Sequence, residues 1–224
     1  MKTYRETVYS IIEFVSGFHV TDDNPLDEIL VGKKMDDVRA LLIKQEYEQK
    51  GTVNDLFYQQ CKVRIEDQDR AKHDDPKEEK ERKEDFEIKQ FHIDFPELLP
   101  NIGWENIKFL GTEGFETKYN RRSADSFIYA EHRRYSSHKV DYTLIGPSRA
   151  LVRNERIAND IFLLGVFKSP LDVPGMTWDS MYPVPDPFKL EMIVKQDILA
   201  GMGIKSDEKN DARHNQEELL GKRN

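Results

Sequence analysis

The residues with the most evident potential for chemistry are His92 and Asp94, which stand two positions apart in an alternating stretch. On a β-strand they would share one face, and imidazole and carboxylate groups are both metal ligands. A metal site needs three or four convergent ligands, however, and no companion motif accompanies this pair. An exposed strand face explains the spacing equally well, so we expect neither a metal nor another cofactor.

The other reactive side chains belong to no enzymatic motif. Cys61 is the single cysteine and lies among apolar residues, which predicts a buried structural thiol rather than a nucleophile. The sequence contains no nucleophile elbow, phosphate-binding glycine loop or paired-histidine metalloprotease helix. We therefore expect a protein that is not an enzyme. A metal-dependent nucleic-acid-processing enzyme is the alternative, because acid–base pairs can lie far apart in sequence.

One segment is basic although the chain is acidic. The 224 residues include 34 lysines and arginines against 42 acids, a net charge of -8, which argues against a protein built only to coat nucleic acid. Between Thr117 and Ile157, bases outnumber acids and tyrosines are interleaved. This pattern predicts contacts either with acidic patches of a neighbouring subunit or with the phosphates of passing DNA. The arginines concerned are Arg121, Arg122, Arg133, Arg134, Arg149 and Arg153.

The elements that must position these residues form an α+β fold, which begins with a bundle of about three helices over residues 1–65. Thr3 and Glu6 have capping-box spacing ahead of an apolar stripe of helical period. A second helix is expected from about Leu26 to Lys50, and a third from Thr52 through Cys61.

Residues 88–170 are expected to form an antiparallel sheet or small sandwich, because short apolar stretches alternate with turn residues there. A one-residue slip in the first stretch predicts either a bulge or a strand at the edge of the sheet. The stretch at 161–167 is the most apolar and should be central. Strands are expected at 87–94, 107–111, 126–130, 140–145, 150–153 and 161–167. A proline-rich connector and a last helix complete the fold over residues 171–204.

Two segments are too polar to join a core. Residues 66–87 are a mixed-charge run, which predicts a solvated loop or an insertion that contacts a neighbouring subunit. Residues 205–224 are a polar extended tail, which we expect to act as an arm that binds a partner protein. The arm residues singled out are Lys205, Asp207, Lys209, Asn210, Asp211, Arg213, Leu219 and Leu220. The sequence has no apolar stretch long enough to span a bilayer, so no membrane partner is expected.

The chain resembles ring and adaptor proteins of crAss-like podoviruses. The resemblance rests on Tyr4–Glu13, Asp22 with Asp23, Val38–Ile43, Asp160–Pro170 and Lys209–Ala212. It implies a structural protein of the virion, made in the host cytoplasm and placed in the head–tail connector, in a ring of twelve copies below the portal. The implied partners are the portal protein, neighbouring copies, other ring or tail proteins and, transiently, phage DNA.

Two points stay open at this stage. The sizeable strand region departs from purely helical adaptors, which leaves open the tier of the connector that the subunit occupies. A non-viral scaffold that binds partners is a further alternative, which particle association would separate from a ring subunit.

Overall fold

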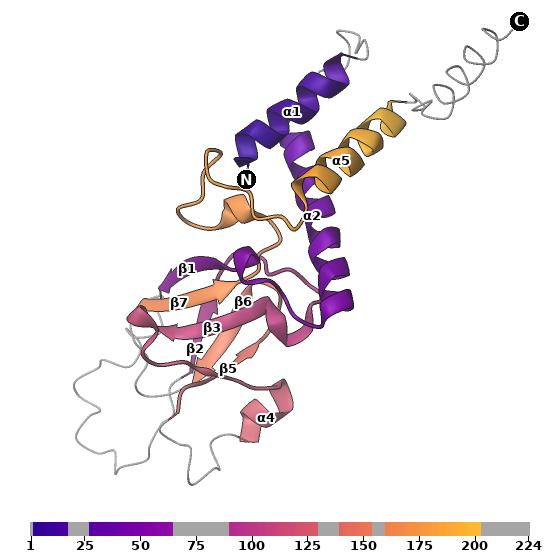
Figure 1. Cartoon of the computed structure of the whole chain (residues 1–224). Helices are drawn as coiled ribbons and strands as arrows, with labels where there is room; N and C mark the ends of the chain where they lie inside the picture. The colour runs from indigo at the N-terminus through magenta and orange to yellow at the C-terminus, as the bar shows by residue number, and fades with distance from the viewer. Residues whose placement is uncertain (1, 18–26, 65–89, 130–138, 154–159, 203–224) are drawn as a thin grey trace, which may run out of the picture.

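The computed structural model describes a mixed α+β protein, as the sequence predicts, with helices gathered at one end and two small sheets at the other (Figure 1). The described residues are 2–17, 27–64, 90–129, 139–153 and 160–202. The mixed-charge run at 66–87 and the arm residues from Lys205 to Leu220 lie outside them, as do Arg133 and Arg134.

The helical end consists of α1 (Tyr4–Ser16), α2 (Glu28–Lys50) and α5 (Pro187–Gly201). The predicted capping box is confirmed, because the Thr3 hydroxyl accepts the Glu6 N–H and the Glu6 carboxylate accepts the Thr3 N–H. These two bonds satisfy amide donors that the first helical turn leaves unpaired. The three helices bury one apolar cluster that includes Val8, Ile11, Val31, Met35, Leu190 and Val194.

The sheet end consists of two sheets that pack on one shared apolar core. The first has the strand order β1-β7-β3 and is antiparallel; the second has the order β2-β6-β5-β4, with a short parallel pair between β4 and β5. The strands are β1 (Gln59–Arg64), β2 (Gln90–Asp94), β3 (Ile107–Thr112), β4 (Asn120–Arg121), β5 (Asp141–Leu144), β6 (Arg149–Arg153) and β7 (Asp160–Gly165).

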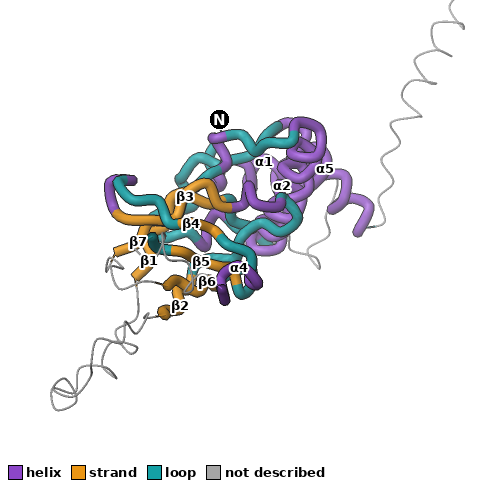
Figure 2. Tube along the Cα trace, turned by 90° about the horizontal axis from the view of Figure 1, so that it is seen from below, coloured by secondary structure: helices purple, strands orange, loops and turns teal. Residues whose placement is uncertain are grey.

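The strand order gives this sandwich two distinct edges. At one edge, β1 of the first sheet contacts β2 of the second. At the other edge the chain passes from β3 to β4, which lie next to each other (Figure 2). The Tyr119 N–H, just before β4, donates to the Leu110 carbonyl of β3 at 2.7 Å and ties this edge together.

Several predicted elements are confirmed. The apolar stretch at 161–167 contains β7, which is the central strand of the first sheet. Strands are also found near 107–111, 140–145 and 150–153, the last two forming a hairpin. Cys61 is buried on β1, where burial raises the pKa of its thiol, as suits a structural cysteine.

Two predictions of local structure are wrong. The expected helix from Thr52 through Cys61 is a 3-10 turn at Asp55–Phe57 followed by β1. The expected strand at 126–130 is the short helix α4 (Ala124–Ile128), which the Ser123 hydroxyl caps by accepting the Ser126 N–H. Of the two interpretations of the slip in the first strand, the edge is confirmed, because β2 is an edge strand of the second sheet and pairs with β6 in unbroken register from Gln90 to Asp94.

A buried cation joins the helical end to the sheet end. Arg39 of α2 is fully buried, and its Nε donates to the Pro183 carbonyl at 2.6 Å while Nη1 donates to the Phe167 carbonyl at 2.8 Å. Burial lowers the pKa of Arg39 and raises the pKa of nearby Asp36, which accepts the Tyr182 hydroxyl at 2.8 Å. The hydrogen bonds of Nε and Nη1 offset part of the cost of burying this cation, and they fix α2 to the segments that follow β7.

Candidate partner-binding pocket

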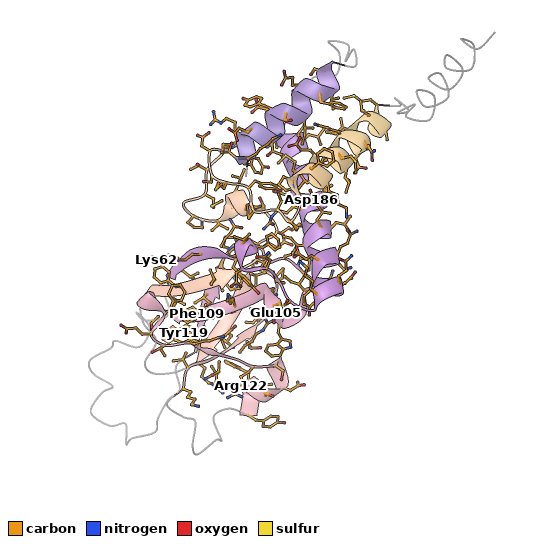
Figure 3. The ribbon with its side chains drawn as sticks, in the orientation of Figure 1. Lys62, Glu105, Phe109, Tyr119, Arg122 and Asp186 are labelled. Carbon is orange, nitrogen blue, oxygen red and sulfur yellow. The ribbon has the colours of Figure 1, made fainter. Side chains whose placement is uncertain are left out.

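A polar pocket of about 490 Å³ opens at the β3–β4 edge of the sandwich. The pocket is lined by residues of the 3-10 turn before β3 (Gly103–Asn106), of β3, of the 118–122 segment and of β5. Figure 3 labels Glu105, Tyr119 and Arg122 of this lining. The full lining is Trp104, Glu105, Ile107, Lys108, Lys118, Tyr119, Asn120, Arg121, Arg122 and Tyr142.

Arg121 is held against one wall of the pocket by three contacts. Its guanidinium lies 4.5 Å from the centre of the Trp104 ring, which is a cation–π arrangement. Nη1 also donates to the Asn106 side-chain oxygen at 2.7 Å and to the Trp104 carbonyl at 3.1 Å. Burial lowers the pKa of Arg121. Both hydrogen bonds of the Arg121 side chain come from Nη1, so they and the ring contact fix the guanidinium at the pocket wall.

Arg122 is fixed by a buried acid at the start of β5. Its Nε lies 3.2 Å from Oδ1 of Asp141, whose side chain is almost fully covered. Next to them, burial raises the pKa of Tyr142 to about 12, against the opposing effect of Arg121, so its phenol is neutral at physiological pH. The ion pair with Asp141 holds Arg122 at the pocket wall.

The pocket carries an excess of positive charge. Four of its lining residues are cationic and one, Glu105, is acidic. Lys108 lies 2.5 Å from Asp55, which offsets part of its charge, and the Glu105 carboxylate accepts the Tyr58 hydroxyl at 3.2 Å. Lys118 is exposed and together with the two arginines gives the pocket its net charge. Such a hollow suits an anionic group, because arginine forks bind carboxylates and phosphates.

A tight turn places the 118–122 segment against β3. Gly111 of β3 lies where the segment after the turn passes closest to this strand. A Cβ added at this position would lie 2.0 Å from the Thr117 carbonyl oxygen. The turn is closed by the Thr112 N–H, which donates to the same Thr117 carbonyl at 3.1 Å. A glycine is therefore required at position 111 for backbone approach.

The structure separates the arginines that the sequence grouped together. Arg121 and Arg122 share the pocket, whereas Arg149 pairs with Asp94 on the exposed side of β6 and β2. Arg153 is buried; its guanidinium lies 5.2 Å from the Phe127 ring centre and donates to the Phe127 carbonyl at 3.1 Å. Arg153 thus stabilises the subunit from within.

Three pocket residues were not singled out from the sequence. Trp104, Glu105 and Lys108 precede the basic segment and reach the pocket only through the pairing of β3 with the rest of the fold. The one local signal was Trp104, one of two tryptophans in the chain, which stays 58% exposed although it is large and apolar.

His92 and Asp94 lie side by side on the exposed face of β2, alternating with buried Phe91 and Ile93. Hydrogen bonds from Arg149 lower the pKa of Asp94 and engage both of its carboxylate oxygens, at 2.5 and 3.1 Å. Among the described residues, no group of three or more histidine, cysteine, aspartate or glutamate side chains is placed to hold a metal ion.

A second surface feature is an apolar ridge on the helices, formed by Phe188, Met192 and Phe14. Phe188 and Met192 are one helical turn apart on α5 and are 78% and 42% exposed. Lys195 continues this face of α5 and lies 4.7 Å from the ring centre of Phe14 on α1. Exposed large apolar side chains grouped in this way are typical of protein–protein contact surfaces.

Comparison with known proteins shows the family to which the chain belongs. The crAss ring 2 family model, described as phage tail ring protein 2, matches residues 6–218. The chain belongs to this family. The match extends over nearly the whole chain, helical end and sheet end together, and confirms the resemblance to crAss-like phage ring proteins.

Membership in the tail ring family makes the chain a structural protein of the virion that assembles with other phage tail proteins. No curated protein sequence matches it. Within the described residues, no helix combines the length and the apolar character that crossing a bilayer requires.

Proposed function

We propose that this tail ring protein is a non-enzymatic subunit of a closed ring of twelve copies in the portal-proximal head–tail connector, through which the phage DNA passes. The observation that carries the proposal is the family match over residues 6–218. The two surfaces support it, because a protein that works by assembly needs exposed contact features and the chain has an apolar ridge and a cationic pocket.

The portal is the proposed partner of the C-terminal arm, residues 205–224. Assembly of the chain with the portal in solution tests this proposal. The chain mixed with purified portal at micromolar concentration is expected to form a complex of defined mass by native mass spectrometry. A chain ending at Ile204 should fold, with an unchanged circular dichroism spectrum, but should not stay attached to the portal. A full-length chain that remains monomeric with portal present would contradict the proposed function.

The ridge is the proposed contact with the next copy in the ring, because a ring family implies that copies meet and the ridge is an uncovered apolar surface of the subunit. Phe188→Ser is expected to weaken association between copies about tenfold or more, since exposed aromatic anchors dominate interface energies. The change should leave stability nearly unaltered, because Phe188 is 78% exposed. Mass photometry over a concentration series measures the association.

Leu56→Ser is the matched control for this prediction. Leu56 is 63% exposed, comparable with Phe188, but lies in the 3-10 turn before β1 and not on α5. It should leave association unchanged. Equal effects of the two substitutions would show that general surface apolarity, and not the ridge, governs assembly.

A further inference from the structure

The two edges of the sandwich are associated with features of opposite charge, an acidic run and a cationic pocket. The mixed-charge run connects β1 to β2, which are the edge strands of the two sheets on one side. The cationic pocket is built on β3 and on the segment that includes β4, which are the edge strands on the other side. The two strands that flank the run in the sequence therefore lie at the edge opposite the pocket. In Figure 3, Lys62 of β1 and Arg122 beside β4 mark these two edges.

The charges of these two features are complementary. Between positions 74 and 87 the sequence has eight acids and four bases, which is the densest acidic stretch of the chain. The pocket has four cationic residues against Glu105 alone. Opposite potentials on two different patches of one molecule favour head-to-tail contacts between copies. Head-to-tail contacts are the kind that close into rings when the rotation between copies fits.

We propose that the cationic pocket of one copy binds the acidic run, residues 74–87, of the next copy. This inference rests on the proposed ring, and it adds to the ridge a second, polar contact between copies: carboxylates of one copy against Lys118, Arg121 and Arg122 of its neighbour. The described strands that flank the run, β1 and β2, lie at the edge away from the pocket, and a head-to-tail ring brings this edge of the neighbouring copy to the pocket.

Protein carboxylates suit this pocket better than DNA phosphates do. A duplex presents phosphates in long rows, so its binding surfaces are extended basic stripes. Here the cations converge on one hollow, and Arg149 and Arg153 are engaged elsewhere in the fold.

The test is a direct titration. A fluorescently labelled synthetic peptide of residues 74–87 is titrated with the full-length chain, kept below the concentration at which copies associate, and followed by fluorescence anisotropy. The peptide should bind. A version with Glu78, Glu79, Glu81 and Glu84 replaced by glutamine should bind at least about tenfold more weakly, because loss of paired charges shifts affinity on this scale.

Lys118→Glu is the matching change in the pocket, because Lys118 is exposed and can be reversed in charge without disturbing the core. It should weaken peptide binding about tenfold. Lys33→Glu makes the same charge change on the exposed surface of α2 and should leave binding unchanged.

Equal binding of the acidic and neutralised peptides, or no effect of Lys118→Glu, would overturn the inference. It would also be overturned if a short DNA duplex bound the pocket more tightly than the peptide, with the same dependence on Lys118. Rings that form normally from the Lys118→Glu chain would reject this contact and leave the proposed ring intact. A wild-type chain that binds the peptide but never forms rings, with or without portal, would instead reject the proposed ring.

Discussion

Replacing Arg39 by methionine is expected to lower the free energy of unfolding by about 3–5 kcal/mol, because removal of one member of a buried charged network leaves its partners unsatisfied. The carbonyls of Pro183 and Phe167 would lose their donors, and Asp36 would lose its nearest cation in this network. Urea unfolding followed by circular dichroism measures the change.

The matched control is Lys44→Met on the same helix. Lys44 is partly exposed and its only ion pair in the described contacts is with Glu48, one turn along α2 at 3.7 Å. Exposed pairs of this kind contribute about 0.3–0.5 kcal/mol, so its stability should stay close to that of the wild type. An Arg39→Met chain as stable as the wild type would show that the network does not join the two ends of the fold.

Gly111→Ala is expected to destabilise the protein by about 2–4 kcal/mol, the range of substitutions that force backbone to move in a packed site. The new Cβ would lie 2.0 Å from the Thr117 carbonyl oxygen, and a main-chain atom cannot rotate away as a side chain does. The segment that carries Lys118, Arg121 and Arg122 would shift with it. Urea unfolding again measures the loss, and the peptide titration should show weaker binding.

Gly146→Ala tests whether the close approach at position 111 is the cause. Gly146 lies in the turn between β5 and β6, and an added Cβ there would meet nothing within 4 Å. Its effect on the free energy of unfolding should be within about 0.5 kcal/mol. Comparable losses for the two alanine variants would refute the steric explanation.

The helices were predictable where local signals agree with packing. The capping box at Thr3 and Glu6 and the apolar stripe behind it are sufficient to place α1, since both are contained in a few residues. The C-terminal helix likewise begins at a proline after a capping acid, Asp186, whose carboxylate accepts the Lys189 N–H. Local sequence determines such ends because the partners are three residues apart.

The errors arose where tertiary contacts override a short pattern. Val53, Leu56 and Phe57 have helical spacing, but the chain makes only one 3-10 turn before Cys61 and Val63 pair with β7 in a sheet. At 126–130 the apolar residues predict a strand. Of α4, however, only Phe127 is buried, and the Ser123 cap favours a helical turn. Short apolar runs do not distinguish strand from helix by period alone.

The candidate site was predictable only in part for a related reason. Arg121 and Arg122 were identified from the local charge, but Trp104 and Lys108 join them only after β3 and the following segment fold together. Arg153 belongs to the same basic stretch, yet its position on β6 buries it against Phe127. Charge counts along a chain cannot tell which arginines face solvent, because alternate strand residues point to opposite faces.

The most direct test of the proposed ring is an electron cryomicroscopy reconstruction of the virion that contains this protein. We expect copies arranged as a closed ring around the tail axis, next to the portal, with the β3–β4 edge of each copy facing the β1–β2 edge of the next. A chain that is absent from the particle, or that is bound as single copies away from the tail axis, would contradict it.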